Sequence, residues 1–163
     1  MDSDEKIQAH LVSVWRESRR FLSIGGKEGM LILTDRHLCF IHKTEAKKKW
    51  WTSIISRQVL KLLKSKDTMI LHDGYVEEDL KKDLENPKNV ELAFDDILEI
   101  SHSEKTWGTV LELEYFKHDK KEKFQYAVAQ DWVKYPAKEP TKFIKVDWEP
   151  FVAFIKKRQK ITK

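Results

Sequence analysis

The sequence predicts an α+β fold, in which about seven short strands form a bent antiparallel β-barrel that a C-terminal α-helix caps. Three observations indicate this. Segments in which apolar and polar residues alternate recur along the chain between turn residues, as in short antiparallel strands. Two apolar runs flank a polar turn at Asp35-Arg36. Residues 147–163 carry apolar side chains at helical spacing.

The composition fits one domain over residues 1–163. With 40% apolar residues among 163, the chain is long enough to bury a core, and a net charge of +4 is too small to indicate nucleic-acid binding. The start MDSDEK lacks the apolar stretch of a secretory signal, and no run is long enough to span a bilayer. One cysteine, Cys39, fits a reducing compartment, so we expect a cytoplasmic protein, with peripheral attachment to a membrane as the alternative.

The N-terminal segment leaves two alternatives open. Its apolar residues recur at helical spacing, which favours an N-terminal helix over residues 3–18. A strand through residues 10–15 is the alternative. The apolar residues that carry the pattern are Ile7, Leu11, Val14 and Trp15.

Residues 19–41 predict a meander of three strands. The segment 19–24 is extended, and Gly25-Gly26 provides a turn because glycine adopts positive φ without steric cost. Residues 29–34 and 38–41 predict two further strands.

Residues 44–88 predict an inserted helical hairpin. Residues 45–66 contain no Gly or Pro and place apolar side chains at helical intervals, and a shorter helix ends before Pro87. Seven Lys or Arg and no acid lie from residue 47 to 66, whereas residues 73–85 hold six acids and two lysines. This complementarity favours packing of the two helices on each other, stripe to stripe.

The strand pattern then returns. Leu111, Leu113 and Tyr115 alternate with glutamates, which is typical of a strand with one buried face. An irregular segment follows at 129–146. The other strands of this region are expected at 90–94, 97–103 and 124–129.

The last element is an amphipathic helix. Asp147 is a suitable N-cap, and Pro150 fits the first turn. Trp148, Phe151 and Ile155 share one face, so we expect them to close the open end of the barrel.

Four segments together carry a family resemblance: GMLILTDRHLCFI, VELAFDDILEIS, GTVLELEY and DWEPFVAFIKK. They resemble the pleckstrin-homology-like superfamily, especially its GRAM and prokaryotic members, over about residues 19–43 and 89–159. The insertion at 44–88 departs from the family pattern. The resemblance implies a non-catalytic binding module, in which Asp96 has a structural role.

Some members of this superfamily bind phosphoinositide headgroups through basic residues on the first two strands and their loop. The corresponding candidates here are Arg19, Arg20, Lys27 and Arg36. The family pattern places Lys or Arg, one residue, then Arg on the second strand, where this chain has the apolar MLILT. A solvated rim of cations is therefore the competing interpretation.

The basic inserted helix is a second candidate surface. Its apolar stripe comprises Trp51, Ile54, Ile55, Val59, Leu62 and Leu63. Trp50, Arg57, Lys61 and Lys64 lie off this stripe, and a basic amphipathic helix with an exposed Trp is typical of segments at membrane surfaces. We expect this outer face to serve as a docking surface.

No catalytic constellation is present: the chain lacks HExxH, paired CxxC, Walker A and GxSxG motifs. We therefore expect no enzyme, no cofactor and no metal. The expected function is binding of a protein or peptide partner. Binding of anionic lipid through the basic helix is the alternative, and nucleic acid is the least favoured partner. The hairpin also offers a surface for homodimerisation.

Overall fold

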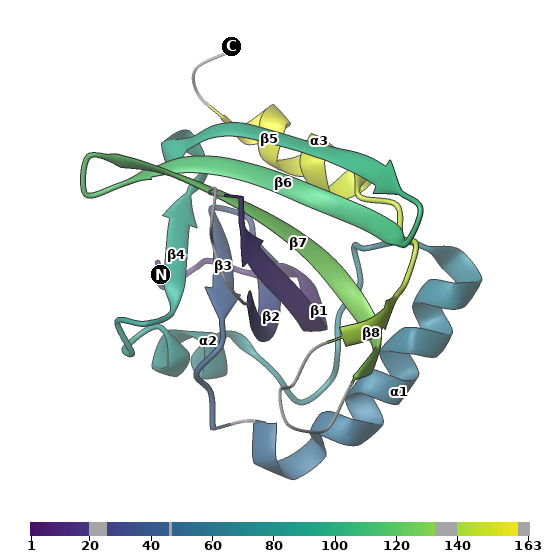
Figure 1. Ribbon diagram of the computed structural model, residues 1–163. Coiled ribbons are helices and arrows are strands. Elements are labelled where there is room, and N and C mark those ends of the chain that lie inside the picture. Colours follow the sequence, from purple (N-terminus) through teal and green to yellow (C-terminus); the bar gives the residue numbers. More distant parts are fainter. Residues whose placement is uncertain (20–25, 46, 133–139, 160–163) are drawn as a thin grey trace.

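The computed structural model has an antiparallel sheet with helices on both sides (Figure 1). It describes residues 1–19, 26–45, 47–132 and 140–159, without the side chains of residues 47–52, 131, 132 and 141. The described strands are β1 (Ile7–Ser18), β2 (Gly26–Thr34), β3 (His37–Ile41), β4 (Val90–Ala93), β5 (Ile97–Lys105), β6 (Gly108–Lys117), β7 (Lys120–Trp132) and β8 (Pro140–Phe143). The described helices are α1 (Lys47–Ser65), α2 (Glu77–Asp83), α3 (Glu149–Arg158) and the short 3-10 helix η1 (Phe94–Asp96).

The strands form two meanders, β1 to β4 and β5 to β7, which join where β1 pairs with β7. The order in the sheet is β4-β3-β2-β1-β7-β6-β5, with β8 paired to β7. All described strand pairs are antiparallel, as the sequence predicts. Among the described residues, the end strands β4 and β5 share no hydrogen-bonded ladder, and η1 connects them. The architecture is therefore α+β with an open sheet, and hydrogen bonding does not close a barrel.

Of the two alternatives for the N-terminal segment, the helix over residues 3–18 is wrong and the strand is confirmed, because residues 10–15 lie within the long strand β1. β1 pairs with β2 on one side and with β7 on the other. Its register shifts between Leu11 and Val14, and Ser13 in the bulge has a φ of 56°. A strand buried on both faces and interrupted by a bulge can place apolar residues at helical intervals, which explains the error. Of the strand expected at 19–24, residues 20–24 lie outside the described residues.

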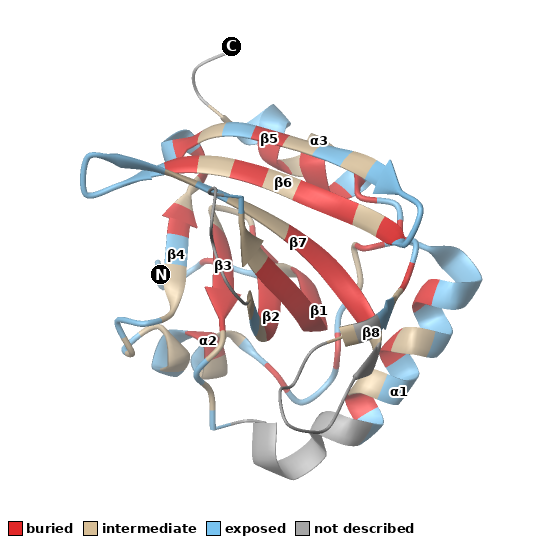
Figure 2. Ribbon diagram, viewed as in Figure 1, coloured by how far each residue is buried: buried red, intermediate tan, exposed pale blue. Residues whose placement is uncertain are grey.

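Strands β1, β2 and β3 are buried on both faces (Figure 2). In β2, Leu31 and Leu33 join the core that contains α3. Met30 and Ile32 point the other way and join a second cluster with Ile54 of α1 and other residues of the insertion. The inserted segment therefore covers the outer face of this part of the sheet.

The two inserted helices form as predicted, but they do not pack stripe to stripe. They lie at different places against the sheet (Figure 1), and the contacts of α1 are mainly with β1. Ile54 of α1 and Leu80 of α2 are instead buried in the cluster that the apolar outer face of β1 to β3 forms. Leu63 of the predicted stripe is consequently 53% exposed.

A glutamine fixes α1 on β1. The buried Gln58 side chain accepts a hydrogen bond from Val12 N (2.7 Å) and donates one to Val12 O (2.6 Å). The Gln58 amide thus bonds to Val12 as the backbone of a neighbouring strand would. Val12 lies in the bulge, where β1 does not pair with β2. His72 Nε2 lies 3.0 Å from the side-chain oxygen of Gln58, Oε1.

Helix α3 packs as the sequence predicts. Trp148, Phe151 and Ile155 are 1%, 0% and 0% exposed and belong to the main core. The N-cap residue is Trp148, one position later than predicted, although Asp147 Oδ1 still accepts a hydrogen bond from Glu149 N (3.0 Å). The segment predicted as irregular contains β8, which pairs with β7.

Candidate functional site: a cationic cleft

Basic side chains from five separate places in the chain line one cleft of about 720 Å³. Two acids, Glu28 and Glu122, also line it. Lys117 and Glu122, which line the cleft, belong to β6 and β7, and the β6–β7 hairpin projects to the left in Figure 1, away from α1. The cations are Arg16 on β1, Lys27 on β2, Lys43 after β3, Lys88 before β4 and Lys117 at the end of β6.

Arg16 is the most buried of these cations, with only 9% of its surface exposed. Its guanidinium carbon lies 4.6 Å from the ring centroid of Phe40 and 4.5 Å from that of Phe124. The two rings hold the planar group in place by cation–π contacts. Within the described part of the chain, no carboxylate lies at ion-pair distance from Arg16. A buried guanidinium without a counter-ion is costly, and an anion in the cleft would offset that cost.

Lys27 increases the positive charge beside Arg16. The two residues are direct partners in the β1–β2 register, so their side chains leave the same face of the sheet. Burial lowers the pKa of Lys27, and the charges of Arg16, Lys43 and other cleft lysines lower it further. Like charges placed opposite each other destabilise a sheet, and a bound anion would remove this repulsion.

Asn89 and His42 join the segments that carry two of the cleft lysines, Lys43 and Lys88. Its Oδ1 accepts hydrogen bonds from His42 N and Lys43 N, both at 3.0 Å. Its Nδ2 donates to Lys43 O (2.8 Å) and to Asp83 O (2.7 Å). His42 Nε2 adds a contact with Lys88 O at 2.8 Å. The segment after β3 and the segment before β4 are thereby joined, although 46 positions separate Lys43 from Asn89.

His42 also lines the cleft and faces its positive charge. Burial lowers the pKa of His42, and the cations Lys27, Arg16 and Lys43 lower it further, against the opposing effect of the Lys88 carbonyl. The ring is therefore neutral at physiological pH and acts through its contact with the backbone. The lining is suited to holding an anion by charge and hydrogen bonds.

The cations predicted at the first strands do not lie together and have different partners. Lys27 lies in the cleft. Arg19 is ion-paired with Glu112 (3.1 Å). Arg36 is ion-paired with Asp2 (2.9 Å) and Asp4 (2.8 Å), so the acidic N-terminus neutralises it. Arg20 lies outside the described residues.

The cations predicted on the inserted helix are brought together, but not with the cleft. Arg57, Lys61 and Lys64 are exposed and share one face of α1, on the opposite side of the molecule from the β6–β7 hairpin (Figure 1). Trp50 belongs to α1, and its side chain lies outside the described part of the chain.

Sequence reasoning missed four of the five cleft cations: Arg16, Lys43, Lys88 and Lys117. The predicted N-terminal helix placed Arg16 outside the sheet. Lys43 and Lys88 border the insertion, and only the antiparallel pairing of β3 with β4 brings its two ends together. That pairing was a usable signal, since an insertion between neighbouring strands must start and end at one place.

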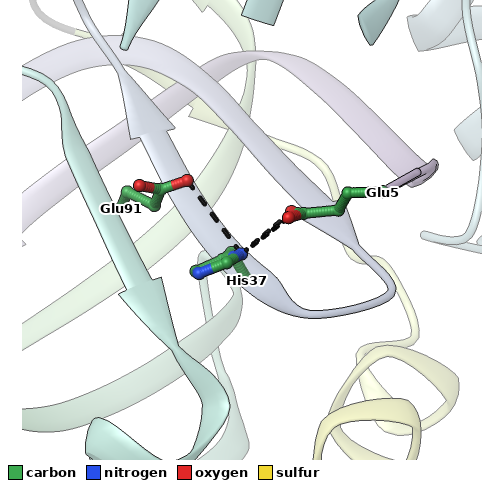
Figure 3. A group of neighbouring side chains, drawn as sticks. All are labelled: Glu5, His37 and Glu91. Atoms are coloured by element: carbon green, nitrogen blue, oxygen red, sulfur yellow. Dashed lines mark hydrogen bonds and ion pairs between the residues drawn. The ribbon is translucent and has the colours of Figure 1, made fainter. Parts of the chain in front are cut away.

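A second cluster of titratable side chains lies at the start of β3 (Figure 3). His37 Nδ1 is 2.9 Å from Glu5 Oε2 and 4.0 Å from Glu91 Oε2, and these residue types can ligate a metal. Glu5, however, also accepts hydrogen bonds from Thr34 Oγ1 and Asp2 N, and the amino group of Met1 pairs with Glu91 (3.1 Å). Burial raises the pKa of Glu5, but these bonds outweigh it and lower the pKa. The cluster fixes the N-terminal segment to β3 and β4.

No protein-family model and no curated protein matches the chain. None of the described helices combines the length and apolarity needed to cross a bilayer.

Proposed function

We propose that the protein is a non-catalytic binding module of the pleckstrin-homology-like kind, and that its cationic cleft receives a phosphate-bearing ligand. The observation that carries the proposal is Arg16, a buried guanidinium without a described carboxylate partner in a cleft with four lysines. Arginine offers several N–H donors in a planar arrangement that matches phosphate oxygens, and the lysines add charge.

The strand order supports the family part of this proposal. The seven strands form two meanders, β1 to β4 and β5 to β7, that join at the β1–β7 pair, and a C-terminal helix packs its Trp148 into the core. Seven antiparallel strands followed by a packed helix agree with the resemblance, although the sheet is open where the resemblance implies a barrel. The cytoplasmic location expected from the single cysteine belongs to the same proposal.

The charge of the cleft refines the partner expected from the sequence. A protein or peptide would present an acidic or phosphorylated side chain to these cations, and a lipid would present its headgroup. Phosphate is the chemistry that the two sources share. The cleft volume of about 720 Å³ leaves room for a group larger than one phosphate.

Calorimetric titration with pyrophosphate tests the proposal. Arg16→Met keeps an apolar side chain between the two rings and removes the guanidinium. Hydrogen bonds to charged groups contribute about 1.5–3 kcal/mol, so we expect binding to weaken by roughly tenfold to a hundredfold. Arg57→Met, on the exposed face of α1, is the matched control and should leave affinity unchanged.

Two further arms identify the source of the phosphate. Vesicles that carry phosphorylated inositol lipids are compared with the same headgroup free in solution. Tighter binding to the vesicles would indicate a lipid, and equal binding a soluble ligand. Equal pyrophosphate affinities for the wild type and Arg16→Met would refute the cleft as the site.

A further inference from the structure

Exposed apolar and basic side chains, together with the half-buried Phe143, gather at the end of the molecule opposite the cleft. We call this surface the apolar–basic patch and define it by Leu60, Leu63, Trp107, Phe143, Lys64, Lys66, Lys142 and Lys145. Leu60, Leu63 and Trp107 are 70%, 53% and 45% exposed. In Figure 1 the β5–β6 turn, β8 and the C-terminal end of α1 lie on the right, and the β6–β7 hairpin extends to the left.

The docking of α1 explains why its leucines face outward. Ile54, Gln58 and Leu62 recur every four residues and are buried against the sheet. At 100° per residue, Leu60 and Leu63 lie about 160° and about 140° from the middle of this buried stripe, so both face away from the sheet.

The β5–β6 turn supplies the aromatic part of the patch. Trp107 lies in this turn, and its ring centroid is 5.0 Å from that of Phe143 on β8. Gly108 permits the approach, because a Cβ there would lie 2.9 Å from Phe143 Cβ. Leu63, Trp107 and Phe143 line one shallow hollow of about 680 Å³.

The patch is positively charged. Lys66, Lys142 and Lys145 line the same hollow, and Lys64 lies beside Leu60 and Leu63 on α1. Lys145 is 3.9 Å from Glu104, an exposed contact of little energetic value. For the other three lysines, the described residues provide no carboxylate at ion-pair distance.

We propose that the apolar–basic patch docks on an anionic lipid bilayer, with Trp107, Leu60 and Leu63 in the interfacial layer and the lysines among the headgroups. Tryptophan prefers this layer, apolar side chains gain from burial in it, and anionic headgroups attract the lysines.

Other partners match this surface less well. A nucleic acid would satisfy the lysines and leave the exposed leucines without an apolar contact. A second copy of the chain in a two-fold dimer would place its own lysines against those of the first copy, and these like charges would repel each other.

Co-sedimentation with phosphatidylcholine vesicles, with and without phosphatidylserine, tests the inference. We expect binding that requires phosphatidylserine and weakens as salt increases. Trp107→Ala should weaken it at least tenfold, and so should Lys66→Glu combined with Lys142→Glu. The matched control is Phe116→Ala, which removes a similarly exposed aromatic ring (49%) at the other end of β6 and should not change binding.

Two variants separate this inference from folding and from the cleft. Leu60→Ser changes a side chain that is 70% exposed, so it should weaken vesicle binding without unfolding the protein. Arg16→Met should bind vesicles as the wild type does. No binding to phosphatidylserine vesicles, an equal loss in Phe116→Ala, or loss of binding in Arg16→Met would overturn the proposal. A dimer that Leu60→Ser dissociates would also overturn it.

Discussion

The cleft and the outer face of α1 both concentrate positive charge, but they hold it in different ways. On α1, Arg57, Lys61 and Lys64 follow one another along a helix and extend into solvent. In the cleft, distant segments direct their cations inward, and Arg16 is buried between two aromatic rings. Cations that are neighbours in sequence spread apart on a convex surface, whereas cations from separate strands can converge on one ligand.

The two surfaces also differ energetically. The solvated cations of α1 are screened by water and salt and cost the fold little. The cleft opposes Arg16 to Lys27 across two strands, which costs stability until an anion is present. Selective binding of phosphate is therefore expected at the cleft.

The largest expected effect concerns the attachment of α1. Gln58→Leu leaves the N–H and C=O of Val12 and one nitrogen of His72 without partners, at about 1–3 kcal/mol for each unsatisfied group. We expect urea denaturation to show a loss of several kcal/mol. Ser56→Ala, on the exposed side of the same helix, should change stability little. If the folded Gln58→Leu protein keeps its pyrophosphate affinity, the cleft does not depend on the attachment of α1. Unchanged stability would refute the role of Gln58.

The second-largest expected effect is a loss of stability in acid, which arises from the buried histidines beneath α1. Burial lowers the pKa of His10 to about 3 and that of His72 to about 4, against about 6.5 in the unfolded chain. At a pH between the folded and the unfolded pKa of each histidine, the unfolded state binds more protons than the folded state does. Stability is therefore complete above about pH 6.5 and falls with acidification by roughly 1.4 kcal/mol per pH unit for each histidine.

Denaturation curves at several pH values check this. His10→Leu should reduce the slope of unfolding free energy against pH by about one proton between pH values of about 6 and 4. The same slope in both proteins would show that His10 is not held neutral by the fold.

A smaller effect is expected from the residue that assembles the cleft. Asn89→Ala removes four hydrogen bonds to His42, Lys43 and Asp83 and should cost about 1–3 kcal/mol of stability. Pyrophosphate affinity should fall with it, because Lys43 and Lys88 lose their common support. Asn86→Ala, which removes one hydrogen bond from Lys88 N in the same segment, is the control with a weaker effect. An Asn89→Ala protein that binds as the wild type does would contradict this role.

The smallest effect should come from reversing charge on α1. Arg57→Glu combined with Lys61→Glu changes two exposed side chains far from the cleft, so stability should stay within about 0.5 kcal/mol and pyrophosphate affinity should not change. Lys27→Glu combined with Lys117→Glu is the counterpart in the cleft and should abolish binding. Comparable losses in both double variants would remove the distinction between the surfaces.

Much of the fold could be predicted from the sequence, because periodicity reports which faces are buried. Alternation identified β6, and helical spacing identified α1 and α3. The continuous apolar runs of β2 and β3 also indicate burial on both faces, but only the structure shows that the insertion covers the outer face. β1 was expected only as the alternative to a helix, because its bulge breaks the alternation, and β8 was missed because it begins with Pro140.

The site was far less predictable. Lys27 was identified because it lies close to the expected turn between two strands. Arg16 and Lys117 are brought to one cleft by the pairing of β1 with β7, two strands far apart in the chain, and local sequence does not encode that pairing. The ion pairs that occupy Arg19 and Arg36 also depend on residues far away in the chain.

An NMR titration of the isotope-labelled protein with pyrophosphate tests the central claim most directly. The account predicts saturable shifts of the Arg16 side-chain Nε–H and of the amides of Lys27, Lys43 and Lys117, with the amides of α1 unchanged. Shifts confined to residues 57–66, or no saturable shift at any cleft residue, would contradict it.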